Sequence, residues 1–317
     1  MTTRMTTRMT WRRGGVRASE RASERAMTEK TCGVYDGTVV VHVYDTLSAP
    51  KPIFSSFLEG ALHVAEVARA HPNFASAHFH YALNDGENAI VEGLPNACFN
   101  FMTFDDVRAK KVWDAFGDLA DAIEMGHANQ IEHALACDEV ATYAPSVAEP
   151  RSVLAQTCAK RKEIQAQGKE APVFGFDESN VVMFVGVKTT SAVDVATWMN
   201  TFGIVNAEAV VGAGSFQDAS LFEVVSCSKS SEREHKFTHV ARVSLGPCGS
   251  DAAKVKAAED AIRRACQSMD ANVFVAPYAC VYNIGKRGTP PGALPAVREI
   301  NRKKKEAAAQ GYVAAKN

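Results

Sequence analysis

One order of strand-like and helix-like segments occurs twice along the chain, and this repeat constrains the fold more than any single motif. The first half reads as strand 38–47, helix 53–71, strands 74–83 and 97–104, helix 105–126 with Asp105 as its N-cap, and strand 139–145. The second half reads as strand 180–189, helix 191–204, strands 220–227 and 236–245, helix 250–269 and strand 272–282. The offset is about 140 residues, which predicts a tandem duplication of one β-α-β-β-α-β unit.

This element order predicts an α+β fold made of two ferredoxin-like modules. Each module would form a four-stranded sheet with both helices on one face, which leaves the other face to be covered. Two such sheets can cover each other and enclose a small cavity, as in dimeric α/β-barrels. A tandem chain would form this barrel within one molecule, as an intramolecular pseudo-dimer.

The segments outside the repeat differ from it in composition. Residues 1–30 contain the short repeats "MTTRMTTR" and "RASERASERA" and form an Arg/Ser/Thr-rich leader, with translation starting at Met1 or Met27. We expect the first module over 31–149, a linker that is partly helical over 150–172, the second, divergent module over 173–285, and a basic tail over 286–317. The arginines of the leader, which no acid accompanies before Glu20, are typical of an organelle transit peptide.

Charge and cysteine content narrow the class of protein. The formal net charge of −1 gives no field that would attract nucleic acid or a membrane surface. The eight cysteines contain no CxxC pair, and no apolar run approaches the roughly 20 residues of a membrane span. We therefore expect a soluble cytoplasmic protein, or a mitochondrial or plastid one if the leader is a transit peptide. Its partner would be a small molecule, and the chain would be a monomer with an internal pseudo-two-fold axis or a homodimer.

The stretch "SAHFHYALNDG" (76–86) supplies the candidate site. Side chains alternate along a strand, so the two histidines of this stretch share a face. The same alternation gives the neighbouring strands one apolar face and one more polar face, and we expect the apolar faces to lie under the helices. The polar set would then converge inside the barrel: His42, Tyr44, His78, His80 and Asn100.

The segment "AHPNFASAHFHYALNDGENAIVEGLPNACFNFMTFDDVRA" (70–109) resembles the antibiotic-biosynthesis-monooxygenase domain. In that family a P-G-F turn leads into a strand that ends in an H-R-S-L-D-G-like hairpin, and a Y-x-x-W-x-S-x-E-D-F strand and helix start follow. Here Asn73 stands for the glycine, Tyr81 and Ala82 stand for Arg-Ser, and the third strand has no Trp. The resemblance covers at most 38–145. It implies the barrel fold more strongly than a reaction, because the family includes cofactor-independent oxygenases, haem-degrading enzymes and small proteins of other kinds.

In a cofactor-independent oxygenation an electron-rich phenolic or polyketide-like substrate loses a proton and itself reduces O2. A histidine suits the base, and Tyr44 and Asn100 suit stabilisation of the anion, so no cofactor is expected. Two alternatives stay open. His42, His78 and His80 could instead hold a metal ion, and the barrel could be a non-catalytic binding or assembly module. An enclosed cavity around the histidines would favour the enzyme, whereas a barrel filled by side chains would favour the module.

Overall fold

The computed structural model describes residues 34–44, 67–84, 87–90, 98–113, 131–143, 152–169, 171, 181–189, 204–212, 216–227, 237–246, 251–267, 271–285 and 292–293. The strands are β1 (Gly37–Tyr44), β2 (Phe74–Asn84), β3 (Glu87–Ile90), β4 (Cys98–Asp105), β5 (Ile131–Tyr143), β6 (Val181–Thr189), β7 (Asp218–Cys227), β8 (His239–Ser244), β9 (Ala271–Gly285) and β10 (Gly292–Ala293). The helices are α3 (Ala109–Val112), α5 (Val153–Ala166), α7 (Ile204–Val211) and α8 (Ala252–Cys266).

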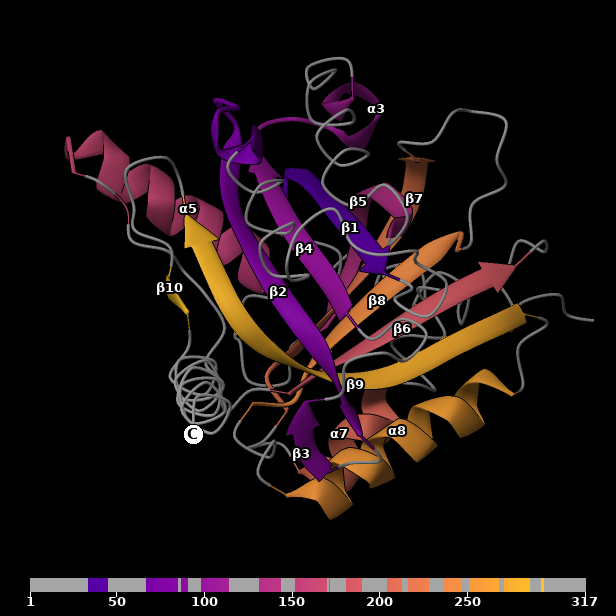
Figure 1. Cartoon of the computed structure of the whole chain (residues 1–317). Helices are drawn as coiled ribbons and strands as arrows, with labels where there is room; N and C mark the ends of the chain where they lie inside the picture. Colours follow the sequence, from indigo (N-terminus) through magenta and orange to yellow (C-terminus); the bar gives the residue numbers. More distant parts are fainter. Residues whose placement is uncertain are drawn as a thin grey trace, which may run out of the picture.

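The described strands form one antiparallel sheet that closes into a barrel (Figure 1). Eight strands follow one another in the order β9-β6-β8-β7-β5-β1-β4-β2, and β2 pairs with β9 to complete the ring. The short strands β3 and β10 extend from β2 and β9. Closure leaves no unpaired edge in the ring, which is the usual way for an antiparallel sheet to avoid pairing with other chains.

Both halves of the chain arrange their four long strands alike. In the first half the order across the sheet is β5-β1-β4-β2, and in the second it is β9-β6-β8-β7. Each is the order fourth, first, third, second. The halves meet through the pairs β5–β7 and β2–β9, so strands of one chain complete the ring.

Several element boundaries differ from the sequence-based expectation. β5 begins at Ile131 rather than at 139. The stretch "IEHALACD" contains alanines, which have a low strand propensity, so the sequence does not predict a strand there. Asp105 is the last residue of β4 and not a helix cap; α3 begins at Ala109 with Arg108 at its N-cap position. Of the expected helix 53–71, residues 67–71 are described, and 67–69 are helical. The helix expected over 191–204 lies outside the described residues apart from Ile204.

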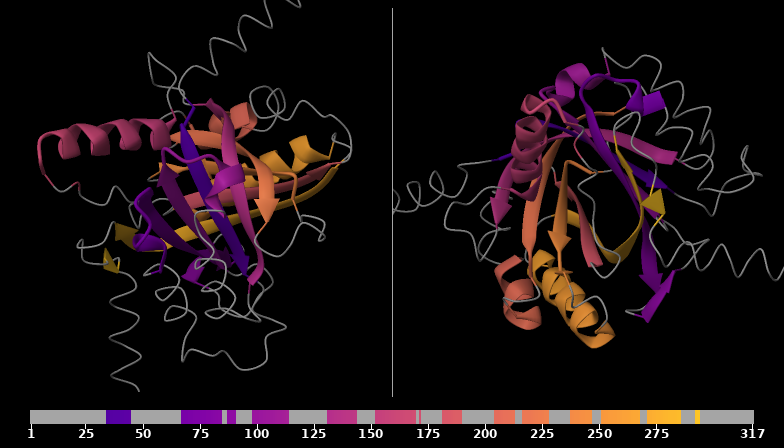
Figure 2. Two further views of the ribbon diagram at one scale, coloured as in Figure 1. Left: turned by 90° about the horizontal axis from the view of Figure 1, so that it is seen from above. Right: turned by 90° about the vertical axis from the view of Figure 1, so that its left-hand side faces the viewer.

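Helices α7 and α8 pack side by side on the outside of the second half (Figure 2). The residues on one face of β6 (Val181, Met183, Val185 and Val187) belong to a buried cluster with Val255, Ala258 and Ile262 of α8. The spacing of these α8 residues is that of one helix face. α5 lies apart from this pair and projects beyond the strands at one end (Figures 1 and 2).

The opposite faces of the strands form the barrel interior. Phe99 and Phe101 of β4 contact Phe184 of β6 and Phe222 of β7, with ring centroids 5.1 and 5.5 Å apart. These strands are not neighbours in the sheet, so the contacts cross the inside of the barrel. Gly186 also faces inward: a Cβ at this position would lie 2.4 Å from the ring of Phe237, so the aromatic packing requires glycine here.

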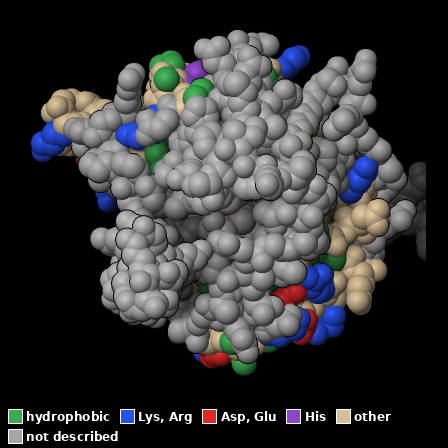
Figure 3. Space-filling view, in the orientation of Figure 1, with side chains coloured by type: hydrophobic (Ala, Val, Ile, Leu, Met, Phe, Trp, Pro, Cys, Tyr) green, Lys and Arg blue, Asp and Glu red, His purple; other side chains and the backbone are tan. Residues whose placement is uncertain are grey.

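Acidic and basic side chains of the described residues lie next to one another at the lower right of Figure 3, where Figure 1 places α8. Over α8, acidic and basic residues alternate and pair, as in the ion pair between Lys256 and Asp260 at 3.3 Å. Such exposed pairs stabilise a helix by a few tenths of a kcal/mol. In the part of the chain that the structure describes, no helix has the length and apolar character needed to cross a membrane.

Candidate functional site in the barrel interior

His78 lies inside the barrel and is hydrogen-bonded at both ring nitrogens. Its Nδ1–H donates to Oδ1 of Asn283 on β9 at 2.7 Å, and its Nε2 accepts from the hydroxyl of Ser76 at 2.9 Å. The pKa of His78 is lowered to about 4, mainly by burial and also by the charges of Arg242 and Arg161, against the hydrogen bond to Asn283. The imidazole is therefore neutral near pH 7, which agrees with one donating and one accepting nitrogen.

His80 is two residues further along β2 and lies on the same face of the strand. Its ring stacks on Phe99 with centroids 4.2 Å apart and planes within 3° of parallel. Its Nδ1–H donates to the carbonyl of His78 at 3.1 Å. Burial and the neighbouring His78 keep the pKa of His80 well below its usual value. The interior thus presents two neutral imidazoles side by side, as the alternation of this strand predicts.

An arginine of the second half, Arg242, reaches into the same interior. Arg242 of β8 is 2% exposed, and its guanidinium carbon lies 5.7 Å from the ring centroid of Phe101, the cross-strand neighbour of His78. Its ion pair with Asp218 of β7 is long, at 3.9 Å. Burial lowers the pKa of Arg242 and raises that of Asp218, since each charge is taken out of water.

Glu139 adds a second buried acid to this part of the barrel. It lies on β5 where the pairing with β7 shifts by one residue, and its carboxylate accepts a hydrogen bond from the backbone N–H of Tyr35. Burial raises the pKa of Glu139 to about 7. A carboxyl group with this pKa can exchange a proton near neutral pH, as a general acid or base must.

A second buried arginine is held in a different way. Arg161 of α5 donates from Nε and Nη2 to the two carboxylate oxygens of Asp105, at 3.0 and 2.7 Å. The hydroxyl of Tyr35 donates to the same carboxylate at 2.7 Å. Burial alone would raise the pKa of Asp105, but the bonds and charge of Arg161 outweigh it and hold this pKa below the usual value. Asp105 is consequently ionised and bidentately paired.

The five side chains expected to converge do not all share one face. His78 and His80 line the interior, whereas His42 and Asn100 are cross-strand neighbours on the outward face of β1 and β4. Tyr44 ends β1, and its side chain lies outside the described part. The expectation that the polar faces turn inward is wrong for β1 and β4, because alternation defines two faces without saying which one the barrel encloses. Here the interior takes the large aromatic residues.

This split also bears on the metal hypothesis. His42 lies on the other side of the sheet from His78 and His80, so the three imidazoles cannot bind one ion. Within the described ranges, no three His, Cys, Asp or Glu side chains are grouped closely enough to hold a metal. The three-histidine set is therefore wrong.

Sequence reasoning missed Arg242, Glu139, Arg161 and Asp105. Arg242 could have been found, because it is the one charged residue in the apolar run "HVARVSL", where an unmatched charge indicates burial with a partner. Glu139 is the first residue of the expected strand 139–145, where nothing in the local sequence indicates a buried acid. The pairing of Arg161 with Asp105 joins residues 56 apart and carries no local signal.

The fold and the interior cluster define the class: an α+β protein with a closed antiparallel barrel and a buried polar site. No protein-family model and no curated protein matches the chain. An anthrone oxidase-like protein aligns with 82% of this chain and 97% of its own at 10% identity and a TM-score of 0.46. Candidate monooxygenases from Lactobacillus acidophilus (81% and 98% covered, 6% identity, TM-score 0.39) and Fusobacterium nucleatum (83% and 99%, 10%, 0.40) also align. Because all three TM-scores are below 0.5, the functional argument rests on this chain's own residues.

Proposed function

We propose that the barrel binds a small acidic organic molecule, of phenol or enol type, as its anion, and that Arg242 receives the anionic oxygen. The position of Arg242 carries this proposal. Its side chain is 2% exposed, and its guanidinium lies 5.7 Å from the ring of Phe101, in the interior that His78 and His80 also line. A guanidinium in a dry, aromatic-lined interior suits an aromatic anion in both charge and shape.

Arg242, rather than a histidine, is the group that would favour ionisation of the ligand. A phenol has a pKa near 10 and His78 one of about 4, so direct proton transfer would be uphill by roughly 8 kcal/mol. A fixed cation beside the phenolic oxygen lowers the pKa of the phenol and stabilises the anion. His78 and His80 then act as neutral neighbours that orient the ligand. His42 and Asn100 have no part in this site.

The reaction that such an anion allows is oxygenation without a cofactor. A substrate with a methylene carbon, made electron-rich by ionisation, gives its electrons to O2. Both C–H bonds of the methylene break, one oxygen atom becomes the new carbonyl on that carbon, and the other leaves as water with the two hydrogens. The four electrons come from the substrate carbon, so the balance needs no other reductant. The resemblance of residues 70–109 to the antibiotic-biosynthesis-monooxygenase domain supports this reaction class.

Oxygen uptake tests the reaction directly. The protein is mixed with an anthrone-type substrate in an oxygen electrode, and the ketone product is quantified by mass spectrometry with ¹⁸O2. We expect catalysed uptake with one labelled oxygen in the product, loss of most of the activity in Arg242→Gln, and normal activity in Arg108→Gln, which changes an arginine that is half exposed. Uptake no faster than in buffer would refute the catalytic proposal.

A non-catalytic binding module is the second candidate, and one observation favours it. Phe99, Phe184 and Tyr278 contact one another across the interior, with centroid distances of 4.7 to 6.2 Å, so aromatic side chains occupy much of the space. Ligand binding without oxygen uptake would select this candidate. The site residues and the anionic form of the ligand would be the same.

We also infer that the chain is a fused pair of ferredoxin-like modules that acts as a monomer on its ligand. The shared strand order, fourth, first, third, second, supports this inference, as does the similar spacing of the segments along the sequence. A chain that supplies all eight strands of its ring needs no second copy to close it.

A further inference from the structure

A ligand of the proposed kind has to reach a site that is closed in this structure. His78, His80 and Arg242 are at most 3% exposed. The eight strands of the ring are paired on both sides, so no opening separates neighbouring strands. Breaking a strand pair would cost several backbone hydrogen bonds, and an end of the barrel is the less costly route.

Helix α5 packs at the end of the barrel at which β1 begins and β4 ends. Leu154 and Cys158 of this helix belong to the same buried cluster as Val39 and Phe101 of the interior. One turn further on, Arg161 pairs with Asp105, the last residue of β4. These three residues lie on one helix face, at spacings of four and three.

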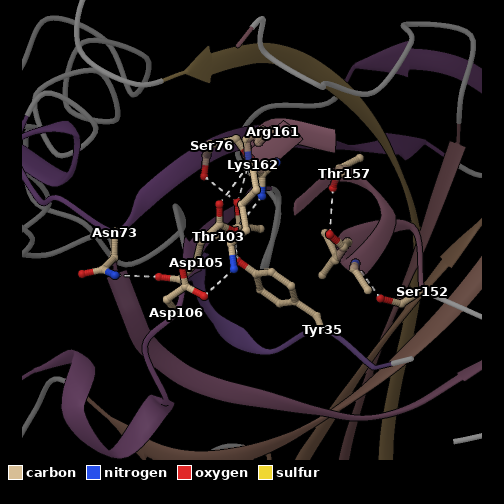
Figure 4. Close-up of polar contacts among 12 residues, drawn as sticks. Tyr35, Asn73, Ser76, Thr103, Asp105, Asp106, Ser152, Thr157, Arg161 and Lys162 are labelled. Carbon is tan, nitrogen blue, oxygen red and sulfur yellow. Dashed lines mark hydrogen bonds and ion pairs between the residues drawn. The ribbon is translucent and has the colours of Figure 1, made fainter. Parts of the chain in front are cut away.

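At this end of the barrel, buried hydrogen bonds connect α5 to the last residue of β4 and to the residues before β1 (Figure 4). Asp105 accepts two bonds from Arg161 and one from the hydroxyl of Tyr35. Tyr35 precedes β1 and sits so close to the chain that a Cβ on Gly37 would lie 2.4 Å from its ring. We call this group, Tyr35, Asp105 and Arg161, the latch.

Among the described residues, α5 buries few side chains. It buries the side chains of Leu154, Cys158 and Arg161, and most side chains from Lys162 to Lys169 are exposed. Its own ends are formed locally: the hydroxyl of Ser152 caps the first turn, and Gly168 with a φ of +70° follows the last. A helix with few buried contacts opens at a lower free energy than the paired strands beneath it.

We propose that α5 is the gate of the barrel and that the latch of Tyr35, Asp105 and Arg161 holds it shut. When the hydrogen bonds of the latch break, α5 moves away from the strands and the end of the barrel becomes accessible to the ligand. Because α5 follows β5 and precedes β6 in the chain, this movement leaves the ring of strands intact. The ligand-entry role rests on the proposed function, whereas the latch itself does not.

The variant Arg161→Met removes the guanidinium group of the latch and keeps a long, unbranched, apolar side chain at this position. The matched control is Lys162→Met, which removes the neighbouring but exposed ion pair with Asp106. Two rates are measured on the full chain: alkylation of the Cys158 thiol, followed by peptide mass spectrometry, and association of 4-nitrophenol by stopped-flow absorbance. Amide hydrogen exchange of residues 153–166 reports helix release independently of thiol reactivity.

We expect Arg161→Met to raise all three rates by about tenfold or more, because it breaks a buried charge pair, and Lys162→Met to change them by less than about twofold. Tyr35→Phe removes one bond of the latch and should give a smaller increase in the same direction, which keeps the test valid if Arg161→Met does not fold. Unchanged exchange in α5 in these variants overturns the latch. Faster exchange with unchanged 4-nitrophenol association overturns the gate.

The probe also separates the two proposals. If the wild-type chain does not bind 4-nitrophenol at any pH, the proposed anion site fails. Alkylation of Cys158 and hydrogen exchange in α5 still decide whether the latch holds the helix.

Discussion

The buried carboxyl of Glu139 makes folding stability depend on pH in a way that one isosteric substitution should remove. Its pKa of about 7 in the folded protein exceeds the usual value of 4.5, so the folded chain holds this proton more tightly than the unfolded chain. Stability from this group is complete below pH 4.5 and is lost as the pH rises through 7. Glu139→Gln cannot ionise, and its amide oxygen can still accept the bond from the N–H of Tyr35.

The size of the effect follows from the difference between the two pKa values. A gap of about 2.5 units corresponds to roughly 3 kcal/mol at high pH, of which about 2 to 3 kcal/mol develops between pH 5 and pH 8. We therefore expect the stability of Glu139→Gln relative to wild type to increase by that amount over this range. Burial lowers the pKa of His78, which gives the opposite slope at acid pH, but this contribution is common to both proteins and cancels.

Urea denaturation at pH 5, 6, 7 and 8 measures this difference. Glu163→Gln, which changes an exposed carboxylate of α5, is the matched control and should show no pH-dependent gain. A difference between Glu139→Gln and wild type that stays constant from pH 5 to pH 8 would refute the burial of an ionisable group at this position.

Three further results are expected. The ring protons of His78 should not titrate between pH 5.5 and 8 in an NMR pH series, because its pKa is about 4; a midpoint near 6.5 would contradict its burial. Gly186→Ala should destabilise the protein by about 1 to 3 kcal/mol in thermal or urea unfolding, since its Cβ would meet the ring of Phe237, and an unchanged stability would mean that the ring does not pack there. The protein should sediment as a monomer near its chain mass of 34.1 kDa, because one chain closes the ring; a stable dimer would count against its acting alone.

The sequence predicts the strands of this protein better than their orientation. Long alternating or β-branched runs such as 180–189 appear as strands within a residue or two of the expected bounds. The strand that begins at Ile131 was expected eight residues too late, because alanine and histidine carry no strand preference and its burial comes from packing on β1 and β7.

The candidate site was predictable for β2 and not for its neighbours. The spacing of His78 and His80 places both on one face whatever the fold. Whether that face is enclosed depends on tertiary packing, which the alternation along one strand does not determine. The phenylalanines of β4 face the interior, so Asn100, which alternates with them, faces outward. The charged groups that complete the interior come from elements far apart in the chain. Arg242 and Asp218 pair across β7 and β8, and Arg161 reaches Asp105 from a helix.

The most direct test of the anion site is the absorption spectrum of 4-nitrophenol bound to the protein. Phenol and phenolate forms of this probe absorb at different wavelengths, so the spectrum reports the charge of the bound molecule. At a pH one unit below the probe's own pKa in water, we predict that wild-type protein shifts it to the phenolate form and that Arg242→Gln does not, while Arg108→Gln behaves as wild type. A bound probe that stays in the phenol form, or a shift that survives Arg242→Gln, would contradict an anion site built on Arg242.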